Sequence, residues 1–169
     1  STLFIPRALT AAEAPKKAKK GDVNDKINIG FIGLGQQAIH LVNGFLTIPE
    51  VRVIAGCDIY DIKRNRFIER VNKYYSEKGI KNKLDMYIKY EELLAREDID
   101  AVVIATPDHW HAAIAIAACK AGKDVYLEKP LTFTVYEGQR LIEAVRANNR
   151  ILQVGSMQRS MAEFIHAAN

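Results

Sequence analysis

A lysine directly before a proline has the clearest capacity for chemistry in this 169-residue sequence. In Glu128-Lys129-Pro130 the proline disfavours helical backbone at the lysine and keeps it extended. A like charge nearby and partial burial both favour the neutral amine, which can accept a proton. We therefore identify Lys129 as a candidate catalytic base that takes a proton from a hydroxyl group as hydride leaves the same carbon. The alternative is a surface lysine paired with Glu128.

A glycine-rich segment, Gly33-Leu34-Gly35-Gln36-Gln37-Ala38, follows an expected strand and opens an expected helix. This is the setting that a dinucleotide-binding turn requires. Gly33 permits the tight turn, Gly35 lets the backbone approach a pyrophosphate, and Ala38 keeps helix and strand close. The free N–H groups of the first helical turn, which includes Gln36 and Gln37, and the helix dipole would attract the diphosphate.

An aspartate, Asp58, follows the second expected strand, roughly 20 residues after the glycines. A carboxylate at this place accepts hydrogen bonds from adenosine ribose hydroxyls and repels a 2′-phosphate, which favours NAD over NADP. Lys63 and Arg64 follow closely and could offset that repulsion, so NADP stays open. The alternatives are a turn or cap role for Asp58, and a methyltransferase, which places glycines and an acid similarly.

A third segment, Thr106-Pro107-Asp108-His109-Trp110-His111, follows the fourth expected strand, at the edge where open α/β sheets bind ligands. Pro107 has no N–H and ends the strand, and Asp108 is expected to cap the next helix. His111 is either a pocket residue or a satisfied histidine at a helix start, and Trp110 either walls the crevice or packs. Residues two apart do not share a helical face, so we expect no metal at the two histidines.

The elements that must position these residues alternate between β-rich and helical stretches from residue 26 onward, which predicts a parallel sheet covered on both faces. We expect a doubly wound α/β domain over residues 26–155 with right-handed crossovers. Thr134 is a suitable N-cap, and Gly122 a suitable helix end. Strands are expected at 27–32, 51–57, 86–88, 101–105, 125–127 and 151–154, and helices at 37–46, 61–78, 90–96, 109–121 and 135–148.

Composition excludes several classes of protein. The formal net charge of +4 is concentrated in the first 26 residues, with six Lys or Arg against three acids, so we expect no nucleic-acid partner for the nearly neutral body. No apolar run reaches about 18 residues, so we expect no membrane span. The two cysteines, Cys57 and Cys119, are too few for a disulfide framework or a four-cysteine zinc site, and we expect them to be small buried residues.

The two ends of the sequence differ from the middle. Residues 1–25 are an expected basic flexible tail, in which Leu3 to Pro6 and the small residues after them suggest a signal-peptide remnant. Export is therefore one hypothesis, and a cytoplasmic location is the other. After residue 155 the alternation stops, and we expect 156–169 to be the start of a second domain, through which the full protein would form a homo-oligomer.

The order of these motifs resembles the N-terminal half of the glucose–fructose oxidoreductase, inositol dehydrogenase and MocA (Gfo/Idh/MocA) family. The resemblance covers roughly residues 26–159, and 121–131, Ala-Gly-Lys-Asp-Val-Tyr-Leu-Glu-Lys-Pro-Leu, is its most specific part. It implies a Rossmann NAD(P)-binding domain followed by a second α/β domain with an Asp/His pair for substrate proton transfer. The family frequently has Asn where this chain has Asp108, which leaves that contact open.

The resemblance also implies roles for individual residues. The lysine that matches Lys129 lies in the active site near the nicotinamide, and the residues that match Thr106, Pro107, His111 and Glu128 border the cofactor.

The function implied is an NAD(P)-dependent oxidoreductase that acts on a hydroxyl of a small sugar or polyol such as a cyclitol, with NAD expected and NADP the alternative. An NAD-dependent glycosidase shares every motif, and a nucleotide-binding module without chemistry is a third hypothesis. The chain alone is expected to bind cofactor but to turn over poorly, because a second domain would supply half of the pocket.

Overall fold

A computed structural model describes residues 26–168, so the expectations for the tail 1–25 and for Asn169 lie outside the described residues. At its centre is a six-stranded parallel sheet in the order β3-β2-β1-β4-β5-β6. The predicted doubly wound α/β fold is therefore confirmed. The strands are β1 (Ile27–Ile32), β2 (Val51–Cys57), β3 (Asp85–Tyr87), β4 (Ala101–Ile104), β5 (Asp124–Glu128) and β6 (Leu152–Gly155).

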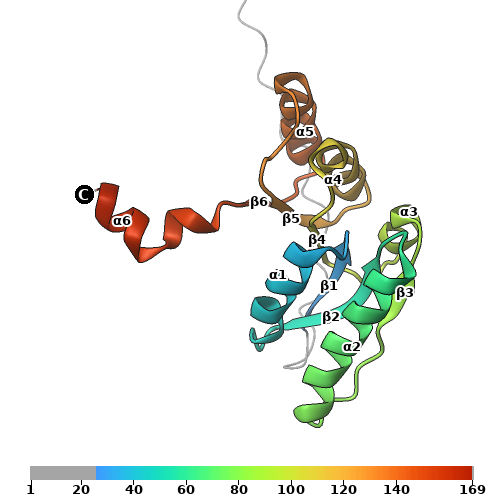
Figure 1. Cartoon of the computed structure of the whole chain (residues 1–169). Helices are drawn as coiled ribbons and strands as arrows, with labels where there is room; N and C mark the ends of the chain where they lie inside the picture. Colours follow the sequence, from blue (N-terminus) through green and yellow to red (C-terminus); the bar gives the residue numbers. More distant parts are fainter. Residues whose placement is uncertain (1–25, 169) are drawn as a thin grey trace, which may run out of the picture.

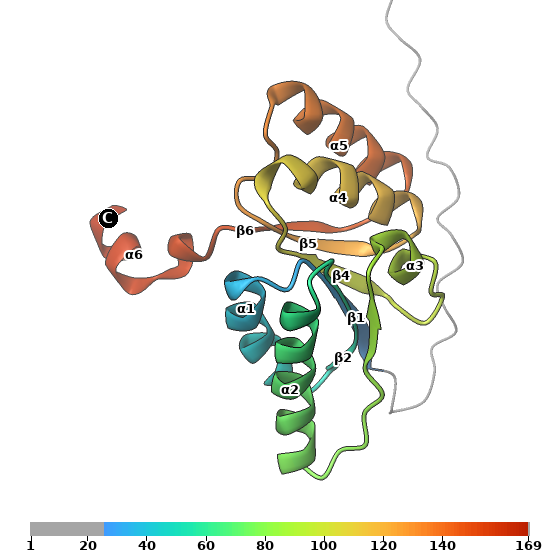
Figure 2. The same cartoon turned by 45° about the vertical axis from the view of Figure 1, so that its right-hand side comes forward.

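Helices cover both faces of the sheet (Figures 1 and 2). They are α1 (Gln36–Leu46), α2 (Asp61–Glu77), α3 (Tyr90–Leu94), α4 (His111–Lys120), α5 (Val135–Ala147) and α6 (Ala162–Ala168), with 3₁₀ turns η1 (Asp108–Trp110) and η2 (Met157–Ser160). Helices α1 and α2 bury one apolar core, around Phe31 and Phe67. Helices α3, α4 and α5 bury the other, around Leu93 and Leu127. Burial on both faces explains why β4 is unbroken and apolar, and why the polar residues of β1 and β2, Asn28 and Arg52, lie near the starts of these strands.

The chain reverses its winding direction between β1 and β4, which lie side by side at the centre of the sheet. Ile32, Ile104 and Leu127 are in register across β1, β4 and β5. The residues that follow them therefore leave the sheet at one edge. Ligands bind at this kind of switch point in open α/β sheets, so the topology brings the three predicted segments to one place.

Two predicted helix ends are confirmed. The Thr134 hydroxyl accepts a hydrogen bond from the Glu137 N–H, and the Glu137 carboxylate accepts one from the Thr134 N–H, which completes a capping box. Gly122 follows α4 with a φ of 77°, a left-handed conformation that favours glycine.

Several predicted boundaries were wrong by one or two residues, and two of them affect the site. The helix expected from residue 109 is a 3₁₀ turn followed by α4, which begins at His111, and the Asp108 side chain makes no capping hydrogen bond. The fifth strand runs on to Glu128, because that residue pairs with Gly155 of β6.

The segment after β6 leaves the sheet, and η2 and α6 extend away from the other helices (Figure 1). Its apolar side chains Met157, Met161, Phe164 and Ile165 are all exposed. Within residues 26–168, no helix has both the length and the apolar content that a membrane crossing requires.

Candidate dinucleotide-binding site

The glycine turn after β1 has one glycine that the backbone requires and one that leaves open space. Gly33 has a φ of 83°, and a Cβ there would lie 2.8 Å from the backbone carbon and oxygen of Ala105. A Cβ on Gly35 would meet no atom within 4 Å. The surface over Gly35 is therefore free for a ligand that approaches the backbone, which fits the diphosphate expected there.

Helix α1 begins directly after this turn with Gly35 as its N-cap, no side-chain cap and no acid in its first turn. Its first backbone hydrogen bond runs from the Ile39 N–H to the Gly35 carbonyl oxygen, at 3.2 Å. The N–H groups of Gln36, Gln37 and Ala38 precede that bond and are free of the helical ladder. This end of α1 can therefore bind an anion through its N–H groups and its dipole.

Asp58 supports the glycine turn from the end of β2. One carboxylate oxygen accepts the Leu34 N–H at 2.8 Å, and the other accepts the Tyr60 N–H at 3.0 Å. The residue is 8% exposed, and the Lys63 ammonium lies 3.8 Å from its carboxylate. Each carboxylate oxygen keeps a further acceptor site, so bracing the turn leaves Asp58 able to accept from ribose hydroxyls.

From the sequence, Arg64 was a cation that could offset the repulsion between Asp58 and a 2′-phosphate. In the structure, other groups of the protein already bind its guanidinium. Its guanidinium donates to the Asp58 carbonyl oxygen at 2.5 Å and to the Asp61 carboxylate. Lys63 remains the more accessible cation beside Asp58.

Cys57 and Cys119 are both buried, as predicted. Burial, and secondarily the Asp58 charge, raise the pKa of Cys57 to about 12. Burial also raises the pKa of Cys119. Neither thiol is a nucleophile at neutral pH.

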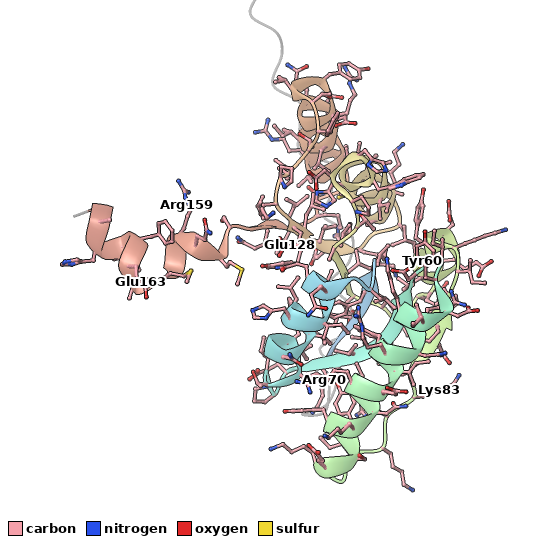
Figure 3. The ribbon with its side chains drawn as sticks, viewed as in Figure 1. Tyr60, Arg70, Lys83, Glu128, Arg159 and Glu163 are labelled. Carbon is pink, nitrogen blue, oxygen red and sulfur yellow. The ribbon has the colours of Figure 1, made fainter. Side chains whose placement is uncertain are left out.

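At the end of β5, Glu128 and Lys129 point to different surroundings. Glu128 is 4% exposed and lies beside the start of α1 (Figure 3). Its carboxylate accepts the Gln37 side-chain N–H at 2.8 Å and the Lys129 backbone N–H at 3.1 Å. Lys129 is exposed, so the partial burial expected for it was wrong. Glu128 is buried, and no ion pair joins it to the Lys129 ammonium within residues 26–168, which argues against a surface ion pair as the explanation of this segment.

A cavity of about 170 Å³ joins the two halves of the site, with Gln37, Ala105, Thr106, Asp108, Glu128 and Lys129 in its wall. The Thr106 hydroxyl is buried, and no hydrogen-bond partner for it exists within residues 26–168. An unpartnered buried hydroxyl suits a site that a polar ligand completes. The helix start and the catalytic candidate therefore meet at one hollow of the sheet edge.

His111 lies between Thr106 and Pro130 and is not part of the cavity wall. It is 1% exposed, and its ring nitrogens lie 2.6 Å from the Pro130 carbonyl oxygen and 3.0 Å from that of Thr106. This fits the satisfied histidine at a helix start rather than a residue that touches a ligand. Pro107 and Trp110 are exposed, so the alternative that Trp110 packs was wrong. No group of three His, Cys, Asp or Glu side chains suited to a metal occurs in the described part of the chain.

Two of the contacts that build the site have no signal in the sequence. The Gln37–Glu128 hydrogen bond joins residues 91 positions apart. The Arg66 guanidinium donates to the Leu34 carbonyl oxygen at 3.0 Å from α2 and so also supports the glycine turn. Nothing in the sequence around Gln37, Glu128 or Arg66 indicates these contacts, because only the fold brings the partners together.

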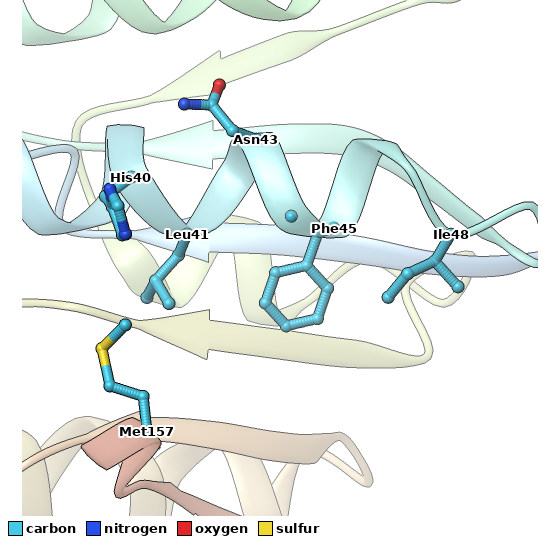
Figure 4. Close-up of a pocket in the computed structure, with 7 residues that line it drawn as sticks. His40, Leu41, Asn43, Phe45, Ile48 and Met157 are labelled. Atoms are coloured by element: carbon cyan, nitrogen blue, oxygen red, sulfur yellow. The ribbon is translucent and has the colours of Figure 1, made fainter. Parts of the chain in front are cut away.

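A larger hollow of about 500 Å³ lies along α1, lined by His40, Leu41, Asn43, Gly44, Phe45, Ile48 and Met157 (Figure 4). It is open and mainly apolar, and it contains none of the residues singled out in the sequence. We therefore assign the ligand site to the smaller cavity at the sheet edge.

Together, the doubly wound sheet, the glycine turn and the free start of α1 define a dinucleotide-binding domain of the Rossmann class. Residues 27–156 match the family model described as "Oxidoreductase family, NAD-binding Rossmann fold". The chain belongs to this family, Gfo/Idh/MocA, and is its NAD-binding domain.

Curated relatives include an alpha-N-acetylgalactosaminidase from Shewanella oneidensis, which is 34% identical over 125 residues. A glycosyl hydrolase family 109 protein from another Shewanella strain has the same identity over the same length. Each match covers 73% of this chain and 27% of the relative, so the chain spans about a quarter of these proteins.

Solved structures of oxidoreductases have the same fold. A 3-ketoreductase from Actinomadura kijaniata, in complex with NADP and TDP-benzene, is 27% identical with a TM-score of 0.73 over 85% of this chain and 41% of that one. A scyllo-inositol dehydrogenase from Lactobacillus casei, with NAD(H) and scyllo-inositol, is 25% identical with a TM-score of 0.68 over 84% and 39%.

Proposed function

We propose that this chain is the NAD-binding part of an enzyme that moves hydride between NAD and a hydroxyl-bearing carbon of a sugar or cyclitol. The observation that carries the proposal is the cavity shared by the free start of α1 and Lys129. The family match and the dehydrogenase and ketoreductase neighbours support the reaction class.

Each residue of the site has a role in this proposal. The first turn of α1 binds the diphosphate, and Asp58 accepts hydrogen bonds from the adenosine ribose. When bound, NAD supplies the acceptor for a hydride from the substrate carbon. Lys129 takes the proton of the hydroxyl group on that carbon as the general base, so the alcohol loses a hydride and a proton and becomes a ketone. His111 holds the segments that follow β4 and β5 together through the Thr106 and Pro130 carbonyl oxygens.

We also propose NAD rather than NADP as the preferred cofactor. The Asp58 carboxylate would repel a 2′-phosphate, and Arg64 is already engaged by Asp61 and the Asp58 carbonyl oxygen. Calorimetric titration with NAD, NADP and S-adenosylmethionine tests this, and tighter binding of either competitor would contradict it.

The catalytic role is tested in the full-length protein with scyllo-inositol, myo-inositol and glucose as substrates. Lys129→Ala is expected to lower kcat by about 100-fold or more, since general-base catalysis contributes on that scale. The Kd for NAD should change little. A variant with unchanged kcat would favour a nucleotide-binding module without chemistry.

A glycosidase that uses the same oxidation transiently is the second candidate, and the 34% identity to the alpha-N-acetylgalactosaminidase favours it. The test substrate is para-nitrophenyl α-N-acetylgalactosaminide. Release of nitrophenol without net formation of NADH would identify the glycosidase, whereas NADH formed in step with ketone would identify the dehydrogenase.

A second domain that begins at residues 156–169 completes the proposed pocket and carries the oligomer interface. The exposed Met161, Phe164 and Ile165 of this segment support the proposal, because they need apolar partners. The 169-residue chain is then expected to bind NAD without turning over polyols. Turnover equal to that of the full-length protein would refute this.

A further inference from the structure

The Glu128 carboxylate lies where three elements of the site meet: the start of α1, the end of β5 and the end of β6. A Cβ on Gly155 of β6 would lie 2.9 Å from one Glu128 carboxylate oxygen and 3.1 Å from its carboxylate carbon. The carboxylate therefore occupies the space that a side chain at residue 155 would take. This close packing gives Glu128 a defined place in the cavity wall.

Two N–H groups stabilise this buried carboxylate. Gln37 donates to one oxygen and the Lys129 backbone N–H to the other, at 2.8 and 3.1 Å. A buried carboxylate depends on such donors, because loss of one leaves an oxygen without water or a partner. Without the Gln37 amide, we expect the Glu128 side chain to rotate so that its carboxylate accepts a hydrogen bond from another donor. That turn would release the backbone N–H of Lys129.

We propose that Gln37 is a positioning residue that orients Lys129 through the Glu128 carboxylate. The inference rests on the proposed function, in which Lys129 is the base. Gln37 belongs to the first turn of α1, whose backbone is the proposed diphosphate site. One helical turn thereby holds the cofactor with its N–H groups and sets the position of the base with a side-chain amide.

The first test is Gln37→Met in the full-length protein, because methionine has a similar length and no N–H donor. With NAD and the polyol or glycoside that the wild type turns over, kcat is expected to fall about 10- to 100-fold, the scale of a small misplacement. The KM and the calorimetric Kd for NAD should stay within about threefold. The matched control is Gln139→Met on the exposed side of α5, which should leave kcat unchanged.

The second test exchanges the two side chains. In Gln37→Glu alone two carboxylates face each other. The ratio of its kcat to that of the wild type at the same pH should therefore be low near neutral pH and should recover as the pH is lowered and one carboxyl gains a proton to donate. When Gln37→Glu is combined with Glu128→Gln, the amide introduced on β5 can donate to the carboxylate introduced on α1 and accept from the Lys129 N–H. This double variant should recover most of the lost kcat. A role in folding alone would leave the kcat of the folded fraction of each variant equal to that of the wild type.

A third readout does not depend on activity. Trace acetylation followed by mass spectrometry measures the reactivity of each lysine in the NAD-bound protein. Gln37→Met should change the rate at Lys129 by about threefold or more, with Lys73 on α2 unchanged as the internal reference. Circular dichroism establishes that each variant is folded.

The outcomes separate this inference from the proposed function. If Lys129→Ala abolishes turnover but Gln37→Met keeps full kcat and an unchanged Lys129 acetylation rate, the positioning role is wrong. If Lys129→Ala itself keeps full kcat, the proposed base is wrong instead. Failure of the exchanged pair to recover kcat, with both single variants impaired, would also overturn the inference.

Discussion

Replacing Asp58 tests whether the glycine turn is held by a carboxylate. Asp58→Ala removes the acceptor of the Leu34 and Tyr60 N–H groups. A hydrogen bond to a charged group contributes about 1.5–3 kcal/mol, and the bond to Leu34 is the buried one. Counting that bond near the upper value and the half-buried bond to Tyr60 near 1 kcal/mol, we expect a loss of about 3–4 kcal/mol in the free energy of unfolding. Asp58→Asn keeps one acceptor oxygen and should lose about half as much.

Urea unfolding followed by circular dichroism measures this loss. With a slope of about 2 kcal/mol per molar urea, the midpoint of Asp58→Ala should fall by roughly 1.5–2 M. The matched control is Asp61→Ala, which removes a carboxylate that is 82% exposed and should cost no more than about 1 kcal/mol. A midpoint for Asp58→Ala equal to that of Asp61→Ala would refute the bracing role.

Three further predictions concern stability and reactivity. Gly33→Ala should lower the free energy of unfolding in urea by at least about 2 kcal/mol, because a left-handed backbone and a close contact both oppose the added Cβ. Gly35→Ala should change this free energy by no more than about 1 kcal/mol but should weaken NAD binding in calorimetry. Equal losses of stability in the two variants would contradict this. Thr134→Ala removes the capping box and should lower the melting temperature by about 2–4 °C in scanning calorimetry, and no shift would count against the cap. Burial raises the pKa of Cys57 from 9.0 to about 12. The thiol therefore loses its proton first in the unfolded state, and the stability that this shift contributes is lost as pH rises from 9.0 to about 12. Urea unfolding at rising pH should therefore show a shrinking difference in stability between the wild type and Cys57→Ala. Ellman's reagent should label Cys57 only on unfolding. A constant difference in stability, or rapid labelling of the folded protein, would refute the burial of this thiol.

Much of the sheet could be predicted from the sequence because its central strands are mainly apolar. The runs at 27–32, 51–57 and 101–104 bury both faces, so few other structures suit them. The edge strand β3 is only three residues long, and its predicted limits are displaced by one residue. The 3₁₀ turn at 108–110 escaped prediction because its residues are equally compatible with a first α-helical turn.

The site was predictable only as far as strand ends determine it. The glycine turn and Lys129 follow strands that parallel topology brings to one edge, so their proximity follows from the order of elements. Side-chain partners depend on tertiary contacts between distant residues. For this reason the sequence did not show that Asp58 accepts the Leu34 N–H of the glycine turn. Nor did it show that His111 contacts the Pro130 carbonyl oxygen instead of lining the cavity.

Strand β5 has a lysine at each end, and the two have opposite surroundings. Lys123, just before the strand, is buried, and its ammonium donates to the carbonyl oxygens of Arg96 and Ile99 at 2.5 and 2.8 Å. Burial lowers the pKa of this amine. Any sliding of β5 along its own axis would pull that ammonium away from both carbonyl oxygens. The far end of the strand, about 20 Å away, thus acts as an anchor that fixes how far Lys129 projects from the sheet.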